Sequence, residues 1–111
     1  MKYNQGDIVL IPYPFTDLSK TKQRPVVIIS KNSINKEHFI VAKITSVIRN
    51  DRFSYQIKQD FIDRPLRKKS EVRTNELFTV HKSLILKKFA SFDKTSFLKL
   101  SECIKENISV V

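Results

Sequence analysis

A single arginine stands directly ahead of an apolar segment near the start of the chain. The sequence runs Arg24-Pro25 and then Val26-Val27-Ile28-Ile29. A guanidinium is a planar fork of donors that matches two phosphate oxygens, and it stays charged at any cellular pH. Pro25 fixes its own φ and biases Arg24 toward an extended conformation, which helps to hold the arginine at a strand edge. Arg24 is therefore either a phosphate-binding group or an exposed loop residue.

Two adjacent hydroxyls, Thr45 and Ser46, follow another apolar segment. Attack on a phosphodiester builds up negative charge, so catalysis needs a fixed cation and a proton donor for the leaving oxygen. A hydroxyl can donate to a non-bridging oxygen or orient the nucleophile. Threonine is also a common strand residue for packing reasons alone.

The remaining reactive residue types are few. Histidine is the usual acid or base of ribonucleases, but the positions of His38 and His81, at a strand entry and a turn, favour surface or capping roles. No His, Asp and Glu grouping has the spacing of metal ligands, so we expect neither a metal nor a cofactor. The one cysteine, Cys103, cannot form an intrachain disulfide, which favours a reducing, intracellular setting.

Charge is the strongest bulk signal. The 111 residues include 21 Lys and Arg against 11 Asp and Glu, a net charge of +10 that attracts polyanions such as nucleic acid. An acidic protein partner would use the same field, and a lysine-rich coding bias would also produce it. The loop 13–23 interleaves aromatic rings with lysines, as single-stranded bases and phosphates require. The basic cluster 64–69 is a contact for RNA or a protein partner, or a solvated turn.

Short strands must position these groups. We expect strands at 7–12, 25–30, 39–47, 53–58, 70–74 and 77–80, with 53–58 returning against 39–47 as a hairpin. The segment after Asp93, a suitable N-cap, changes to a helical period with apolar residues at Phe97, Leu100, Ile104 and Ile108. The pattern predicts a mainly β, α+β fold: a small, partly closed barrel with one C-terminal helix packed on it.

No repeat or linker divides the chain, so we expect one domain over residues 1–111. The apolar stretch 8–11 is too short for a signal sequence or a membrane span, which predicts a soluble protein with no membrane partner.

Three blocks of the sequence resemble the MazF/PemK-type (Kid-like) toxin family. They are "GDIVLIPYPFTDLSKTKQRPVVIIS", "VAKITSVIRN" and "SEVRTNELFTVHKSLI", in the family's order and at the expected separation. The resemblance implies an SH3-like barrel, similar to MazF, Kid and CcdB, that works as a homodimer in the bacterial cytoplasm. It also implies the toxin of a type II toxin–antitoxin system, neutralised by a cognate acidic antitoxin.

The activity implied by the resemblance is that of an mRNA interferase. Such an enzyme cleaves single-stranded RNA sequence-selectively and without metal, by attack of a 2′-OH that leaves a 2′,3′-cyclic phosphate and a 5′-OH. The resemblance implies catalytic roles for Arg24, Thr45 and Arg73. At position 75, where the Kid-like branch has an aspartate, this chain has Asn75, which cannot exchange a proton. RNA-binding residues are expected at Phe15, Thr16, Lys20, Lys22, Gln23, Ser46 and Asn75.

Two alternatives remain open from the sequence. The first is a non-catalytic toxin on the same barrel that binds a protein target, similar to the gyrase poison CcdB, because fold alone does not decide function. The second is an RNA-binding module whose catalytic site is degraded, which Asn75 would explain.

Overall fold

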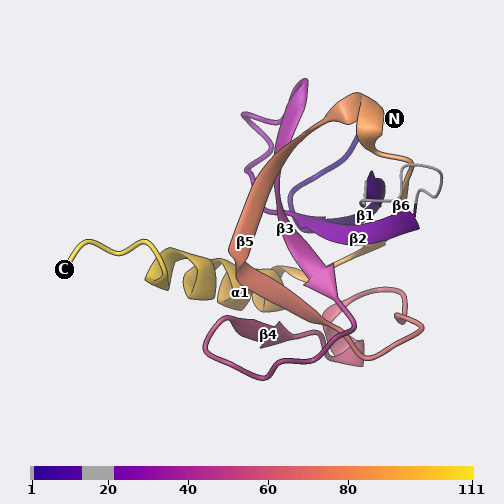
Figure 1. Cartoon of the computed structure of the whole chain (residues 1–111). Coiled ribbons are helices and arrows are strands. Elements are labelled where there is room, and N and C mark those ends of the chain that lie inside the picture. The colour runs from indigo at the N-terminus through magenta and orange to yellow at the C-terminus, as the bar shows by residue number, and fades with distance from the viewer. Residues whose placement is uncertain (1, 14–21) are drawn as a thin grey trace.

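The computed structural model describes residues 2–13 and 22–111. Six antiparallel strands form one sheet in the order β4-β5-β3-β2-β1-β6. The strands are β1 (Asp7–Tyr13), β2 (Lys22–Ile28), β3 (His38–Thr45), β4 (Ser54–Gln56), β5 (Glu71–His81) and β6 (Lys87–Ser91). Two 3-10 turns, η1 (Gln59–Phe61) and η2 (Lys82–Leu84), and the helix α1 (Lys94–Glu106) complete the chain. The sheet curls into a half-barrel, which confirms the predicted mainly β fold with a C-terminal helix (Figure 1).

Each central strand serves two hydrophobic cores, because successive strand residues point to opposite faces. Ile8 and Val27 oppose each other and enter one core, while Val9 and Val26 oppose each other and enter the second. Burial on both faces explains why the central strand β2 is a continuous apolar run rather than an alternating one.

The first core lies under α1. Leu100 is fully buried and Ile104 nearly so, and both pack with residues of β1, β2, β3 and β5. The helix begins as predicted, since the Asp93 carboxylate accepts a hydrogen bond from the backbone N–H of Ser96 at 2.7 Å. Figure 1 shows α1 lying beside β5 and β4, with the C-terminus leading away from the sheet.

One residue of the predicted helical face, Ile108, lies outside the helix. The helix ends at Glu106, and Ile108 lies beyond it with 72% of its surface exposed. Asn107 caps the helix, and its side-chain amide donates to the carbonyl and hydroxyl oxygens of Thr74 at 3.2 and 3.0 Å. This tie to β5 directs the chain out of the helix before Ile108 reaches the core.

The predicted hairpin of 39–47 with 53–58 is wrong. β4 pairs with β5, and β5 pairs on its other side with β3, so that Val72 lies between Tyr55 of β4 and Ile44 of β3. β3 already has β2 and β5 as neighbours and has no edge left for β4.

β5 is one strand of 11 residues, not the two expected segments. Its register with β3 shifts between Ala42 and Ile44, so the polar stretch that resembled a break is an irregularity within the strand. β6 was not anticipated, because Lys87 and Lys88 hide its pattern. Lysines are typical of an edge strand, and β6 is the outer strand next to β1.

Two leucines of α1 provide a matched test of this packing. Leu100→Ala should lower the free energy of unfolding by about 2–5 kcal/mol, because it removes a fully buried side chain and leaves a cavity. Leu98→Ala, at a position that is 58% exposed, should change it by less than about 0.5 kcal/mol. Urea denaturation of both variants measures the difference, and equal losses would contradict the observed orientation of α1.

Candidate active site

A cavity of about 550 Å³ opens where the ladder between β2 and β3 ends. Within β2, only Val26, Val27 and Ile28 pair with β3. The first residues of β2 therefore pair with β1 alone. Pro25 has no N–H to donate to a third strand, which fits the end of the ladder at this point. The residues lining the cavity are Leu10, Arg24, Pro25, Lys43, Ile44, Thr45, Ser46, Val47, Arg49, Leu66, Arg67, Lys68, Ser70, Lys87 and Phe89.

Strand register brings Arg24 and Thr45 to the same place. The last paired residues of β2 and β3 are Val26 and Lys43, and continuing that antiparallel register by two positions sets Arg24 opposite Thr45. Opposite residues of antiparallel strands lie on the same face of a sheet. Both side chains line the cavity, so the structure brings together the two residues that the sequence singled out for phosphate chemistry.

The hydroxyl of Thr45 also ends its strand. Thr45 Oγ1 accepts a hydrogen bond from the backbone N–H of Val47 at 3.1 Å, and the chain leaves the sheet there, two residues earlier than predicted. A hydroxyl accepts through its lone pairs and keeps one O–H donor, so Thr45 can still donate to a ligand. Ser46 is exposed and also lines the cavity.

The charged residues that line the cavity are all cationic. Beside Arg24 they are Lys43, Arg49, Arg67, Lys68 and Lys87, and the described lining contains no carboxylate and no imidazole. Lys43 also lies 3.5 Å from a carboxylate oxygen of Glu76, outside the lining. A concave surface with charges of one sign focuses its field and attracts a polyanion.

The sequence reasoning anticipated some of these cations and missed Lys43, Arg49 and Lys87. Arg67 and Lys68 belong to the basic cluster 64–69, for which a contact role was one of the predictions. Arg49 lies between the expected strands 39–47 and 53–58, and Lys87 lies on the unpredicted β6. Recognising Lys87-Lys88 as the lysines of an edge strand would have been the available signal.

Other predicted site residues lie elsewhere. Lys22 and Gln23 are exposed on β2, and Asn75 is exposed on β5, but none of the three lines the cavity. Phe15, Thr16 and Lys20 fall in the segment 14–21, outside the described residues.

Arg73 is buried in a cluster of carboxylates. Its side chain is 5% exposed, and its Nη1 lies 2.7 Å from Glu71 Oε2 and 2.9 Å from Asp51 Oδ1. Its Nη2 donates to Asp51 Oδ2 at 3.0 Å, and its Nε donates to Glu76 Oε2 at 3.3 Å. These pairs leave no accessible face of the guanidinium for a phosphate, so the geometry favours a positioning role for Arg73 over direct contact.

Two carboxylates of this cluster, those of Asp51 and Glu71, have lowered pKa values. Hydrogen bonding from Arg73 is the main reason that the pKa of Asp51 falls from 3.8 to about 2. Burial alone would raise the pKa of Glu71, but hydrogen bonds from Ser54, Arg73 and two backbone N–H groups outweigh it and lower the pKa. The pKa of Arg73 is raised, chiefly by its hydrogen bond to Asp51.

The histidines lie far along the sheet from these residues. His81 Nδ1 accepts a hydrogen bond from the backbone N–H of Ser83 at 3.0 Å and caps η2, which confirms a capping role. His38 pairs with His81 across β3 and β5, with ring centroids 5.1 Å apart. Among the described residues, no group of three His, Cys, Asp or Glu side chains could hold a metal ion.

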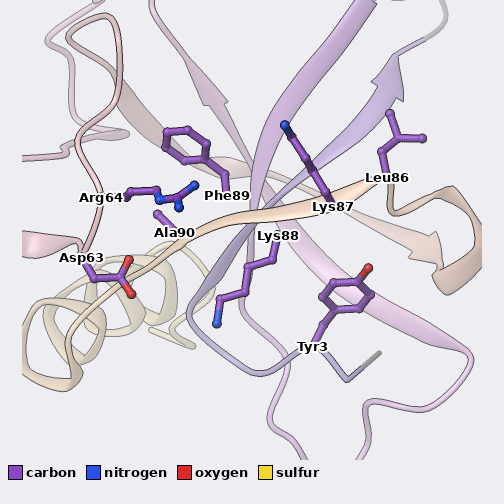
Figure 2. Close-up of a pocket in the computed structure, with 8 residues that line it drawn as sticks. All are labelled: Tyr3, Asp63, Arg64, Leu86, Lys87, Lys88, Phe89 and Ala90. Carbon is purple, nitrogen blue, oxygen red and sulfur yellow. The ribbon is translucent and has the colours of Figure 1, made fainter.

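A second hollow, of about 480 Å³, flanks the edge strand β6. Figure 2 shows Phe89 and Lys88 projecting to opposite sides of the β6 ribbon, with Arg64 near Phe89 and Tyr3 on the side of Lys88. Lys87 and Phe89 line both hollows, so β6 contributes a wall to each.

The chain belongs to the family of PemK-like, MazF-like toxins of type II toxin–antitoxin systems, whose model matches residues 4–108. No curated protein sequence matched the chain. Within the described residues, no helix has the length and apolar character needed to cross a membrane.

Solved structures share this fold at low sequence identity. An endoribonuclease in complex with its cognate antitoxin, from a mycobacterial species, matches with a TM-score of 0.80 at 12% identity, over 99% of this chain and 98% of that one. MazF from a MazE–MazF complex of Deinococcus radiodurans has a TM-score of 0.78 at 11% identity, over 98% of both chains. The Mycobacterium tuberculosis toxin MazF-mt6 has a TM-score of 0.75 at 17% identity, over 95% and 98% of the two chains.

Acid should weaken the fold through the Asp51–Arg73 pair. Because the folded-state pKa of Asp51 is depressed, the pair contributes fully above the ordinary value of 3.8, and the contribution is lost as the pH falls toward about 2. Urea denaturation across this window should show stability falling with pH, and Asp51→Asn should flatten that fall. Asp60→Asn, an exposed position in η1, is the matched control. The same acid dependence in Asp51→Asn and wild type would rule out this pair as its source.

Proposed function

We propose that the chain is an mRNA interferase, an endoribonuclease that cuts single-stranded RNA at selected sequences without a metal ion. One observation carries the proposal: in a MazF/PemK-family chain, Arg24 and Thr45 line one cavity in which every charged residue is a cation. In the proposed reaction, a ribose 2′-OH attacks the adjacent phosphorus and the bond to the 5′-oxygen breaks. The products are a 2′,3′-cyclic phosphate and a 5′-OH.

The two residues have different roles in this reaction. The attack adds negative charge to the phosphoryl oxygens, and the guanidinium of Arg24 stabilises that charge with paired donors in fixed directions. Thr45 donates its O–H to a non-bridging oxygen or orients the nucleophile. A guanidinium is a poor general base, so the role proposed for Arg24 is binding and charge stabilisation rather than proton transfer.

The cavity also fits the class of substrate. An RNA strand carries a phosphate at every nucleotide, and the further cations of the lining can meet the phosphates that flank the one attacked. The proposal also includes contacts to RNA outside the cavity centre. These contacts come from Ser46 and from the exposed Lys22, Gln23 and Asn75. Phe15, Thr16 and Lys20 are proposed to stack on or contact bases.

The proposal includes two protein partners. Both the homodimer and the cognate acidic antitoxin are proposed from the family, and an antitoxin accompanies the toxin in two of the similar structures. The +10 charge supports an acidic partner, because such a partner would compete with RNA for the same field.

Cleavage assays in EDTA test the catalytic roles. Purified wild type should cut single-stranded RNA, and Arg24→Ala should slow cutting by about 10²–10³-fold, the cost of losing one donor to a developing oxyanion. Thr45→Val should slow cutting by a smaller factor, since Val keeps the strand shape and removes only the hydroxyl. Lys31→Ala, an exposed position between β2 and β3 and outside the cavity lining, is the control for loss of a positive charge.

Mass spectrometry of the products identifies the 2′,3′-cyclic phosphate. Equal cleavage by wild type and Arg24→Ala, or cleavage that requires added metal, would refute the proposed roles. RNA left intact while DNA gyrase is inhibited would assign the chain to the CcdB-like class. RNA bound tightly but never cut would identify a binding module.

A further inference from the structure

Glu71 is a fully buried carboxylate outside the cavity lining. It lies on β5 opposite Thr45 of β3, so it is the cross-strand neighbour of the predicted catalytic residue on the same face of the sheet. An ionised group at such a site costs free energy unless every lone pair finds a donor. The hydrogen-bond donors around Glu71 therefore indicate the role of its carboxylate.

Two of these donors are backbone groups of the loop 46–53, which joins β3 to β4. Glu71 Oε1 accepts hydrogen bonds from the N–H groups of Arg49 at 3.2 Å and Asn50 at 3.4 Å. The other carboxylate oxygen accepts from Ser54 Oγ at 2.6 Å and Arg73 Nη1 at 2.7 Å. One carboxylate thus joins the middle of the loop to the start of β4.

Arg73 connects the same carboxylate to the far half of the loop. Its two terminal nitrogens bind both oxygens of Asp51, and Asp51 Oδ1 also accepts from the backbone N–H of Phe53 at 2.9 Å. Asn50, whose N–H is one of the groups bound by Glu71, has a positive φ of 49°. Asparagine tolerates this conformation better than most residues do. The loop is therefore fixed at Val47, Arg49, Asn50, Asp51 and Phe53.

This hydrogen-bond network holds Arg49 at the cavity. Its backbone is held by Glu71, while its exposed side chain lines the cavity with Arg24. A neutral glutamine at position 71 has only one acceptor oxygen, so it cannot serve both the loop N–H groups and Arg73.

We propose that Arg49 is a further RNA-contacting residue, which binds a phosphate next to the one attacked, and that Glu71 and Arg73 are positioning residues that hold its backbone at the cavity. This inference rests on the proposed function, because the ligand is the same RNA strand. It assigns the Glu71–Arg73 pair to substrate binding through Arg49 rather than to the stability of the sheet alone.

Amide hydrogen exchange tests the positioning step without any RNA. In Glu71→Gln, the amides of Arg49 and Asn50 should exchange faster than in wild type, while the amide of Val27 in the central strand should be unchanged. Arg49→Ala should leave the amide of Asn50 protected, since it removes only a side chain. Equal protection of Arg49 and Asn50 in wild type and Glu71→Gln would overturn the positioning role.

Binding of RNA tests the contact. The probe is a short fluorescein-labelled single-stranded RNA pool of mixed sequence, 2′-O-methylated throughout so that the 2′-oxygen cannot attack. Arg49→Ala should weaken binding about tenfold and reduce the slope of log K against log[salt] by about 0.7, the share of one single-strand phosphate. Arg52→Ala, on the same loop but outside this cavity, should change neither quantity.

A double-mutant cycle separates positioning from general stability. If Glu71 acts through Arg49, then Arg49→Ala should cost less affinity in the Glu71→Gln background than in wild type. Independent losses that multiply would overturn the inference, as would an unchanged salt slope in Arg49→Ala. If wild type binds no RNA, the proposed function fails as well; if only the Arg49 effects are absent, the proposed function stands and this inference fails.

Discussion

The early end of the β2–β3 ladder is the constraint on which the site depends. The two strands stay paired through Val26 and Lys43 and then separate, with Pro25 at the point of separation. The residues that would have continued the ladder, Arg24 and Thr45, face a cavity instead of each other's backbone. The buried residues of the paired segment fix the register of β2 against β3. The packing of the two cores therefore also sets where Arg24 and Thr45 lie relative to each other.

Positive and negative side chains near the site occupy different environments. Cations line the open cavity, whereas Glu71 and Asp51, which lie outside its lining, are engaged by Arg73 and by backbone N–H groups. A carboxylate within the cavity would repel phosphate, while the same group outside the lining can order a loop. In the inference above, these acidic residues aid the binding of an anion without contacting it.

Local sequence patterns predicted what depends on neighbours in the chain. The Arg24-Pro25 pair, the hydroxyl of Thr45 and the Asp93-capped helix follow from short segments. The helix starts as expected, whereas Arg24 lies within β2 rather than ahead of it, and β3 ends at Thr45 rather than at residue 47. What pairs across the sheet could not be predicted from those segments. The true partner of β4 and the role of Arg73 depend on contacts between residues far apart in the chain, such as Arg73 with Asp51. The lysine-rich β6 also lacks the apolar alternation that identifies a strand.

The cluster around Arg73 contains more carboxylates than cations. Three carboxylates, of Asp51, Glu71 and Glu76, surround one guanidinium, and even with the nearby Lys43 included the formal charge of the cluster is 2 − 3 = −1. On a chain with a net charge of +10, this is a local patch of the opposite sign. The cluster therefore offers a polyanion no net attraction, in contrast to the cavity, whose charged lining residues are all cations.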